Sequence, residues 1–242
     1  MMDEKLEQLK QMLETSNQIV FFGGAGVSTE SKIPDFRSSD GVYHQKHFRY
    51  PPEVMLSHEF YENHTYDFFD FYITMLFPDA LPNPAHLKLA EWEKQGKLKA
   101  VITQNIDGLH QMAGSKQVYE LHGSVKRNYC SQCGAFYDEE IILANNGKIP
   151  YCEKCGGIIK PDVVLYGEGL DNDVVSGAVN AIREADMLIV GGTSLVVYPA
   201  AGLINYYHGN KLVLINRDST SYDSKADLII HDSIGKVFAQ MP

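Results

Sequence analysis

QIVFFGGAGVS, residues 18–28, is the stretch that decides the fold of this chain. Residues 18–22 form a short apolar, β-branched run, and a glycine-rich segment follows without a break. Such runs bounded by glycines are typical of strands, and the small residues that follow are typical of a tight turn. The stretch therefore predicts a strand, a glycine-rich turn and the start of a helix, in that order.

The same alternation continues along the rest of the chain. Helices are predicted for residues 4–14, where three leucines share one face, and for residues 84–95, which have a proline near the start. Strands that are apolar throughout and alternate with helices form parallel sheets covered on both faces. The sequence therefore predicts an α/β fold, a Rossmann-like parallel sheet with helices on both faces. Its further strands are expected at residues 99–103, 187–191, 211–215 and 227–230.

Two segments break this alternation and indicate inserts. Residues 41–82 are rich in aromatic side chains and contain no strand-like run, so we expect a helical insert that lines a pocket or groove. Residues 126–160 hold all four cysteines and form a second, compact unit. We therefore expect a small domain made of the helical insert 41–82 and a zinc-binding module 126–160. The Rossmann-like domain would consist of residues 1–40, 83–125 and 161–242.

Length and charge narrow the class of protein. A chain of 242 residues corresponds to about 1.6 domains of ~150 residues, which fits one large domain with a smaller insert. Its formal net charge of −10 repels phosphate backbones and favours cationic partners such as lysine-rich peptides. Apolar runs are far shorter than the ~20 residues that span a bilayer, and the N-terminus lacks the features of a secretory signal. We expect a cytoplasmic protein that binds neither nucleic acid nor membranes.

The four cysteines indicate a metal site. They read C-x2-C-x18-C-x2-C, and two such pairs can close a tetrahedral thiolate cage around zinc. Four thiolates leave no coordination position for a water molecule, so we expect a structural zinc ion and not a catalytic one. The segment between the pairs is acidic, which disfavours a nucleic-acid-binding ribbon. The expected ligands are Cys130, Cys133, Cys152 and Cys155.

Small and polar residues follow several of the expected strands. The turn at residues 24–26 would let the backbone approach a pyrophosphate, although a purely structural turn explains it equally well because the third glycine of the dinucleotide fingerprint is missing. Residues 191–194 and Asn216 follow two further strands. An open α/β sheet binds its ligand at the carboxyl ends of its strands. Together the three strand ends favour a nucleotide site.

Residues 103–110, TQNIDGLH, place polar side chains just beyond another strand, and His122 follows in the sequence ELHG. The amides could bind a carboxamide or ribose hydroxyls, but turn formation and helix capping also explain Asn and Asp here. His122 could act as a general base near neutral pH or serve a structural role. These alternatives stay open on the residues alone.

The motifs and their order resemble one family, the sirtuins, NAD-dependent protein-lysine deacylases, over nearly the full length of the chain. The motifs that carry the resemblance are GAGVS at 24–28, IPDFR at 33–37, TQNIDGLH at 103–110, LHG at 121–123, the four cysteines, PDVVLYGE at 161–168, GTSL at 192–195 and IN at 215–216.

The resemblance implies the chemistry of the site. The acyl oxygen of lysine attacks the ribose carbon that bears nicotinamide, and His122 deprotonates a ribose hydroxyl, which leads to free lysine and O-acyl-ADP-ribose. It implies catalytic roles for His122, Asn105 and Asp107, with the last two at the nicotinamide pocket. The residues that it implies for NAD binding are Gly24, Ala25, Gly26, Thr29, Phe36, Arg37, Gln104, Asn105, Ile106, Asp107, His122, Gly192, Thr193, Ser194, Asn216 and Asp232.

The resemblance also implies where an acyl-lysine peptide binds. The peptide would pair by β-augmentation with residues 163–166 and a second edge near residues 167–170. Relatives that remove acidic acyl groups carry Tyr-x-x-Arg in the aromatic insert, where this chain has Phe69 and Tyr72, so neutral acyl groups are expected to be preferred over succinyl. The expected peptide-binding residues are Val163, Val164, Leu165, Tyr166 and Gly167.

Two departures from the family pattern lie in the cofactor loop: Gly23 replaces a threonine and Lys32 replaces a glycine. Neither removes a residue of the chemistry. Two other functions stay open: mono-ADP-ribosyl transfer to protein, which uses the same electrophile, and binding of NAD metabolites without turnover.

Overall fold

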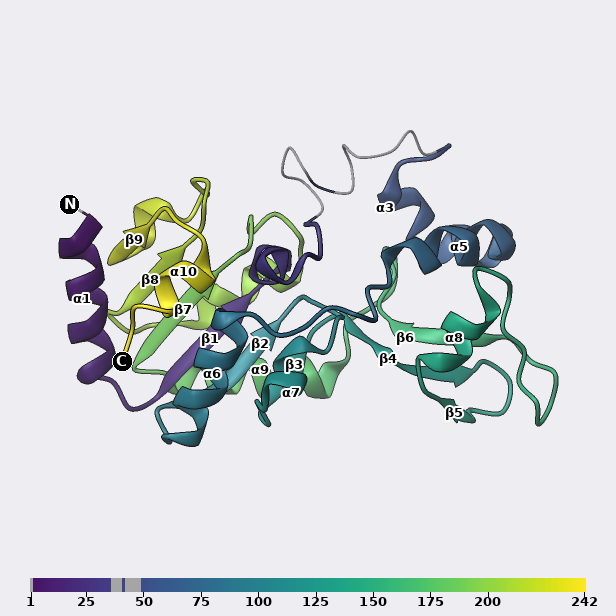
Figure 1. Cartoon of the computed structure of the whole chain (residues 1–242), viewed down its shortest axis with the longest axis horizontal. Helices are drawn as coiled ribbons and strands as arrows, with labels where there is room; N and C mark the ends of the chain where they lie inside the picture. Colours follow the sequence, from purple (N-terminus) through teal and green to yellow (C-terminus); the bar gives the residue numbers. More distant parts are fainter. Residues whose placement is uncertain (1, 36–40, 42–48) are drawn as a thin grey trace.

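The computed structural model describes residues 2–35, 41 and 49–242. They form two parts, a large domain that contains both termini and a small domain at the other end of the molecule (Figure 1). Among the described residues no helix is both long and apolar enough to cross a membrane.

A six-stranded parallel sheet forms the centre of the large domain. Its order, β3-β2-β1-β7-β8-β9, places the first strand in the middle with the later strands on either side, which is the Rossmann arrangement. The expected strands are all confirmed, and the sheet has one additional strand of only three residues, β3. The strands are β1 (Ile19–Gly23), β2 (Leu98–Thr103), β3 (Val118–Glu120), β7 (Met187–Gly191), β8 (Leu212–Ile215) and β9 (Leu228–Ile230).

Helices cover both faces of this sheet, as expected. Alternate residues of β1 point to opposite sides, so that Ile19 and Phe21 join one hydrophobic core and Val20 and Phe22 join the other. One face is covered by α1 (Met2–Glu14), α6 (Pro84–Lys94) and α10 (Ile234–Phe238), and the other by α9 (Asn172–Glu184) and the 3-10 helix η4 (Ala200–Tyr206). Two further short helices described in this domain are α7 (Leu109–Ala113) and η5 (Asp223–Lys225).

The segment after β1 has the expected order of strand, turn and helix start, but its helix is not an α-helix. In place of an α-helix it forms two 3-10 turns, η1 (Ala25–Val27) and η2 (Thr29–Ser31). The carbonyl oxygen of Val27, which would accept the next α-helical bond, instead accepts a hydrogen bond from Asn83 Nδ2 at 2.7 Å. A helix thus begins after the turn, but it is a short 3-10 helix, and the acceptor that would continue it as an α-helix is taken by a side chain 56 residues away in the sequence.

The small domain combines a helical layer with a small sheet. The helical layer, from the aromatic insert, packs its aromatic rings into one cluster with residues of the sheet, such as Val125 and Val163. The sheet is antiparallel, in the order β5-β4-β6. The elements are α3 (Pro52–Met55), α4 (His58–Asn63), α5 (Thr65–Tyr72), η3 (Ile73–Met75), β4 (Gly123–Cys130), β5 (Phe136–Tyr137), α8 (Glu140–Asn145) and β6 (Ile159–Val163).

Strands β4 and β6 also connect the two domains, since each runs from the edge of the large domain into the small one (Figure 1). The division expected at residues 125 and 160 falls inside these two strands and stays a prediction.

A candidate active site between the two domains

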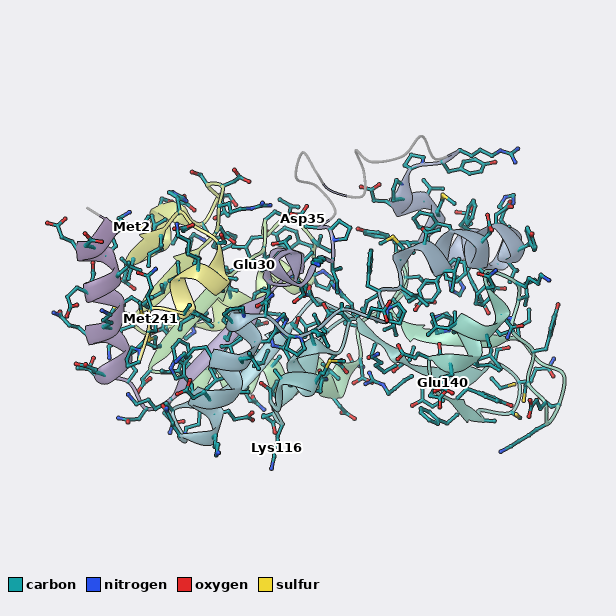
Figure 2. The ribbon with its side chains drawn as sticks, viewed as in Figure 1. Met2, Glu30, Asp35, Lys116, Glu140 and Met241 are labelled. Atoms are coloured by element: carbon teal, nitrogen blue, oxygen red, sulfur yellow. The ribbon has the colours of Figure 1, made fainter. Side chains whose placement is uncertain are left out.

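A cavity of about 440 Å³ lies between the carboxyl edge of the parallel sheet and the small domain. Figure 2 shows Glu30 and Asp35 at the end of the large domain that faces the small domain, and Asp35 lines the cavity. Of the predicted cofactor residues, Phe36 and Arg37 lie outside the described part of the chain. All the other predicted cofactor and peptide residues line this one cavity: Gly24, Ala25, Gly26, Thr29, Gln104, Asn105, Ile106, Asp107, His122, Val163, Val164, Leu165, Tyr166, Gly167, Gly192, Thr193, Ser194, Asn216 and Asp232.

Two glycine loops, one after β1 and one after β7, meet on the cavity wall. The Gly26 amide donates to the Gly192 carbonyl oxygen at 2.8 Å. A Cβ on Gly26 would lie 2.8 Å from Gly192 Cα, and one on Gly24 would lie 2.8 Å from Thr193 Cβ. Backbone packing thus requires the glycines here, and it also places bare backbone at the switch point of the sheet, where such folds bind a nucleotide.

Ser28 connects the two residues predicted for the nicotinamide pocket. Its Oγ donates to Asp107 Oδ2 at 2.6 Å and accepts from Asn105 Nδ2 at 3.0 Å. Ser28 and Asn105 are buried, so this network has a fixed geometry. In the sequence, Ser28 stands out only as the last residue of the GAGVS motif at 24–28. Its contacts span 77 and 79 positions, and no local pattern indicates them.

His122 lies on the same cavity with one nitrogen already bonded. Its Nδ1 is 3.0 Å from the carbonyl oxygen of Gln104. A carbonyl only accepts, so Nδ1 is the donor and Nε2 carries the free lone pair. Burial lowers the pKa of His122 from the ordinary value of 6.5, although the bond to Gln104 opposes this shift. The ring is therefore neutral near pH 7 and able to accept a proton at Nε2.

The opposite end of the cavity offers donors for a ribose. Asn216 Oδ1 accepts from the Thr193 amide at 2.9 Å, while its buried Nδ2 has no hydrogen-bond partner among the described residues. A buried amide of this kind needs an acceptor, and a cofactor hydroxyl or ring nitrogen would supply one.

Two ion pairs lie at the same end of the cavity. Arg217 pairs with Asp35 at 3.1 Å. Asp232 is held by Lys236 at 2.7 Å, and this hydrogen bond lowers the pKa of Asp232. The polar side chains at this end of the cavity therefore fit the ribose and base of a dinucleotide.

Several backbone groups of the predicted peptide edge are engaged within the chain. The Val164 amide donates to the His122 carbonyl oxygen at 3.0 Å, and the Leu165 amide donates to Glu168 Oε2 at 2.9 Å. Tyr166 exchanges hydrogen bonds with residues 56 and 58 of the helical insert. These contacts fix the edge next to His122. Its role in binding a peptide stays a prediction.

The four cysteine sulfurs form a cluster in the small domain, away from the cavity. All lie within 4.8 Å of one another, and the pairs Cys130–Cys155 and Cys133–Cys152 are 3.4 and 3.6 Å apart. Tetrahedral zinc with sulfur at ~2.3 Å separates its ligands by roughly 3.8 Å, so the cluster fits this ion. Tyr137 also donates a hydrogen bond to Cys152 Sγ at 3.2 Å. None of the four cysteines lines the cavity, which agrees with a structural metal site.

The sequence is similar to one protein family and to named bacterial proteins along most of its length. The model of the Sir2 family matches residues 24–199. The NAD-dependent protein deacetylase of Clostridium acetobutylicum is 65% identical over 236 residues, which cover 97% of this chain and 96% of that protein. The protein of the same name from Clostridium perfringens is 61% identical, with 99% of both chains covered.

Solved structures agree as well. A Sir2 complex with a deacetylated p53 peptide and 3'-O-acetyl ADP ribose has a TM-score of 0.90 at 37% identity, covering 97% of this chain and 96% of that one. A Sir2 complex with a p53 peptide and NAD+ has a TM-score of 0.85 at 39% identity, with the same coverage. Together with the cavity, its paired glycine loops and the cysteine cluster, these matches show that the chain belongs to the Sir2 family.

Proposed function

We propose that this chain is an NAD-dependent protein-lysine deacetylase that releases nicotinamide and O-acetyl-ADP-ribose. The observation that carries the proposal is His122, a neutral base whose Nε2 is free, in the same cavity as the nucleotide-type loops of the parallel sheet. The relatives from the two Clostridium species have the name of this activity, and the related Sir2 complexes contain its peptide and acetyl-ADP-ribose products.

Each group in the site has a task in this reaction. Bound NAD supplies an electrophilic ribose carbon and the ribose hydroxyls. His122 Nε2 accepts the proton of a ribose hydroxyl, and the bond from Nδ1 to Gln104 keeps the ring in the tautomer that can do so. The network of Ser28, Asn105 and Asp107 holds the amide and carboxylate that face the nicotinamide end. The zinc cluster supports the fold of the small domain.

The site favours neutral acyl groups over acidic ones. Tyr72 lines the cavity at the position where relatives specific for acidic groups have an arginine, and Phe69 is buried away from it. The nearby cation, Lys126, is already paired with Glu139 at 2.6 Å. Among the described residues, a succinyl carboxylate at this end of the cavity would therefore find no free cationic partner.

The deciding experiment measures nicotinamide release from NAD with and without an acetyl-lysine peptide. Deacetylation predicts release that depends on the peptide, with free lysine and O-acetyl-ADP-ribose in equal amounts. Labelled protein without O-acetyl-ADP-ribose would indicate ADP-ribosyl transfer instead, and NAD binding with no nicotinamide release would indicate a binding protein. Either result would contradict the proposal.

We also propose that the protein acts in the cytoplasm. The four cysteines are free thiols arranged for metal binding and not as disulfides, which suits a reducing compartment. Fractionation of the native cells with an antibody against the chain tests this location, and recovery outside the cytoplasm would contradict it.

A further inference from the structure

The end of the cavity that lies in the small domain is lined mainly by apolar side chains. They come from the aromatic insert, from the connecting strands β4 and β6, from the loop after β2 and from the residues just after β6, and they share one hydrophobic cluster. An apolar lining of this kind suits the alkyl part of an acyl group. The residues are Met75, Leu76, Ile106, Val125, Val163 and Leu165.

This end of the cavity is continuous with the catalytic histidine. The Val164 amide is bonded to the carbonyl oxygen of His122, so residues 163–165 pass directly beside it. On the other side, the Val125 amide donates to the carbonyl oxygen of Ile106 at 2.9 Å. An acyl group whose carbonyl lies at His122 would therefore extend its remaining carbons between these two walls. This placement of the acyl group rests on the proposed function, because it assumes that the reacting group is an acyl-lysine.

One polar group in this apolar end, the hydroxyl of Tyr72, has no partner among the described residues. Tyr72 is 1% exposed, its ring stacks on Phe68 at 5.5 Å, and its hydroxyl makes no hydrogen bond to the described residues. By contrast, the hydroxyls of Tyr137, Tyr207 and Tyr222 all have partners. A buried hydroxyl without a partner is unfavourable, and phenylalanine would fill the same space without that cost. The hydroxyl of Tyr72 therefore indicates that an acceptor reaches it in some bound state.

The surroundings keep this hydroxyl a donor. Burial raises the pKa of Tyr72, and the carboxylates of Glu139 and Asp162 raise it further, so the proton stays on the oxygen. The other polar groups on this side, Lys126 and Glu139, are bonded to each other. The acceptor that suits Tyr72 is therefore a neutral oxygen, since a carboxylate would come close to Glu139.

We propose that the acyl end of this site selects acyl groups with a neutral oxygen on their alkyl part, such as 3-hydroxybutyryl, and that the Tyr72 hydroxyl donates a hydrogen bond to that oxygen. The inference deepens the proposed deacetylase function: it names a class of acyl-lysine that would be removed in preference to a plain alkyl group of equal length.

The test compares two acyl-lysine peptides of identical sequence, one butyryl and one 3-hydroxybutyryl, the latter prepared as separate enantiomers. We expect one enantiomer to have a kcat/KM about 3- to 10-fold above that of the butyryl peptide, the range of a single neutral hydrogen bond. The difference should lie mainly in KM, because the contact is remote from the reacting atoms. In Tyr72→Phe the ratio should fall to about one or below. A ratio compared within each enzyme is insensitive to a general loss of activity.

Tyr66→Phe is the matched control, because Tyr66 lies on the same helix and is 61% exposed. It should keep the wild-type ratio. If neither enantiomer exceeds butyryl in the wild-type enzyme, or if Tyr72→Phe keeps the preference, the inference is wrong. An acetyl-lysine peptide assayed in parallel separates this outcome from failure of the proposed function. Removal of acetyl without a hydroxyacyl preference refutes only the inference, and no NAD-dependent removal of any acyl group refutes both.

Discussion

His122 donates through Nδ1 to the carbonyl oxygen of Gln104, 3.0 Å away, and this bond leaves Nε2 as its only free lone pair. The backbone thus selects the tautomer of His122. Burial lowers the pKa of this histidine, so the ring is already neutral and can accept a proton directly. Replacement of His122 by alanine should reduce the rate of deacetylation by about 10²- to 10⁴-fold, the usual contribution of a general base.

Binding of NAD should survive in His122→Ala, and isothermal titration calorimetry together with product analysis checks both effects. The wild-type enzyme should lose kcat/KM on the acid side with a midpoint below the ordinary histidine pKa of 6.5, because the folded protein disfavours the charged ring. His208→Ala, at an exposed position, serves as control. Undiminished product formation by the His122 variant would remove this residue from the mechanism.

Ser28→Ala should weaken the nicotinamide end of the site. It leaves the Nδ2 of Asn105 without its acceptor and removes the hydrogen bond to Asp107. Leaving a buried donor unpaired costs about 1–3 kcal/mol, so we expect kcat/KM for NAD to fall about 10- to 100-fold. Steady-state kinetics measure the change, with the exposed Ser131→Ala as control. Wild-type values for Ser28→Ala would show that the network does not position Asn105 and Asp107 for the reaction.

Glu139→Gln should shift acyl preference toward acidic groups. The substitution removes the negative charge that pairs with Lys126 at 2.6 Å, and the free ammonium would then be available to a succinyl carboxylate. We expect the ratio of kcat/KM for succinyl-lysine over acetyl-lysine to rise about tenfold, equivalent to about 1.4 kcal/mol. The neighbouring exposed Glu140→Gln should leave this ratio unchanged. A wild-type enzyme that already prefers succinyl would contradict the expectation of neutral acyl groups.

Tyr137→Phe should loosen the metal site. The lost hydrogen bond to Cys152 Sγ is of the kind whose removal lowers metal affinity by about 10- to 100-fold. A chromophoric chelator measures the affinity and the rate of zinc release. The exposed Tyr151→Phe on the same module is the control. Equal zinc affinity in Tyr137→Phe and wild type would show that this bond does not stabilise the thiolate.

Two buried histidines should make the large domain sensitive to acid. Burial lowers the pKa of His86 to about 4, and it also lowers the pKa of His110, whose ring lies 4.7 Å from that of His86. A histidine with a depressed pKa in the folded state takes up its proton more readily when unfolded, so stability is lost as the pH falls below about 6.5.

For His86 alone the loss would reach about 3 kcal/mol at pH 4, at 1.36 kcal/mol per pKa unit. Urea denaturation at a series of pH values measures it. His110→Phe should flatten this dependence, whereas exposed His208→Gln should not. An identical pH dependence in His110→Phe and wild type would count against this explanation.

The parts of the fold that could be predicted are those in which neighbours in sequence determine the structure. The run after Gln18 is apolar on both of its sides, and β1 is buried on both faces. The spacing of the cysteines likewise predicted the metal cluster, because the two cysteines of each pair flank one tight turn. The cofactor residues were predicted from the order of the motifs, and all of them that the structure describes line one cavity.

The parts that escaped prediction depend on contacts across the chain. The helix after β1 is short and of the 3-10 type, and its Val27 carbonyl oxygen accepts a hydrogen bond from Asn83, 56 positions away. Ser28 reaches Asp107 across 79 positions. The unpartnered hydroxyl of Tyr72 can be recognised only when every side chain around it is placed. Local pattern contains none of this information, because the partners come together only after the two domains fold.

The contact between Gly26 and Gly192 limits how this molecule could be redesigned. A methyl group at either position would have to separate the backbones of two loops, which follow the neighbouring strands β1 and β7 of the central sheet. Libraries of variants intended to change the preferred dinucleotide should therefore keep Gly26 and Gly192 unchanged. They should instead diversify exposed positions that line the cavity, such as Arg217, whose side chain pairs with Asp35.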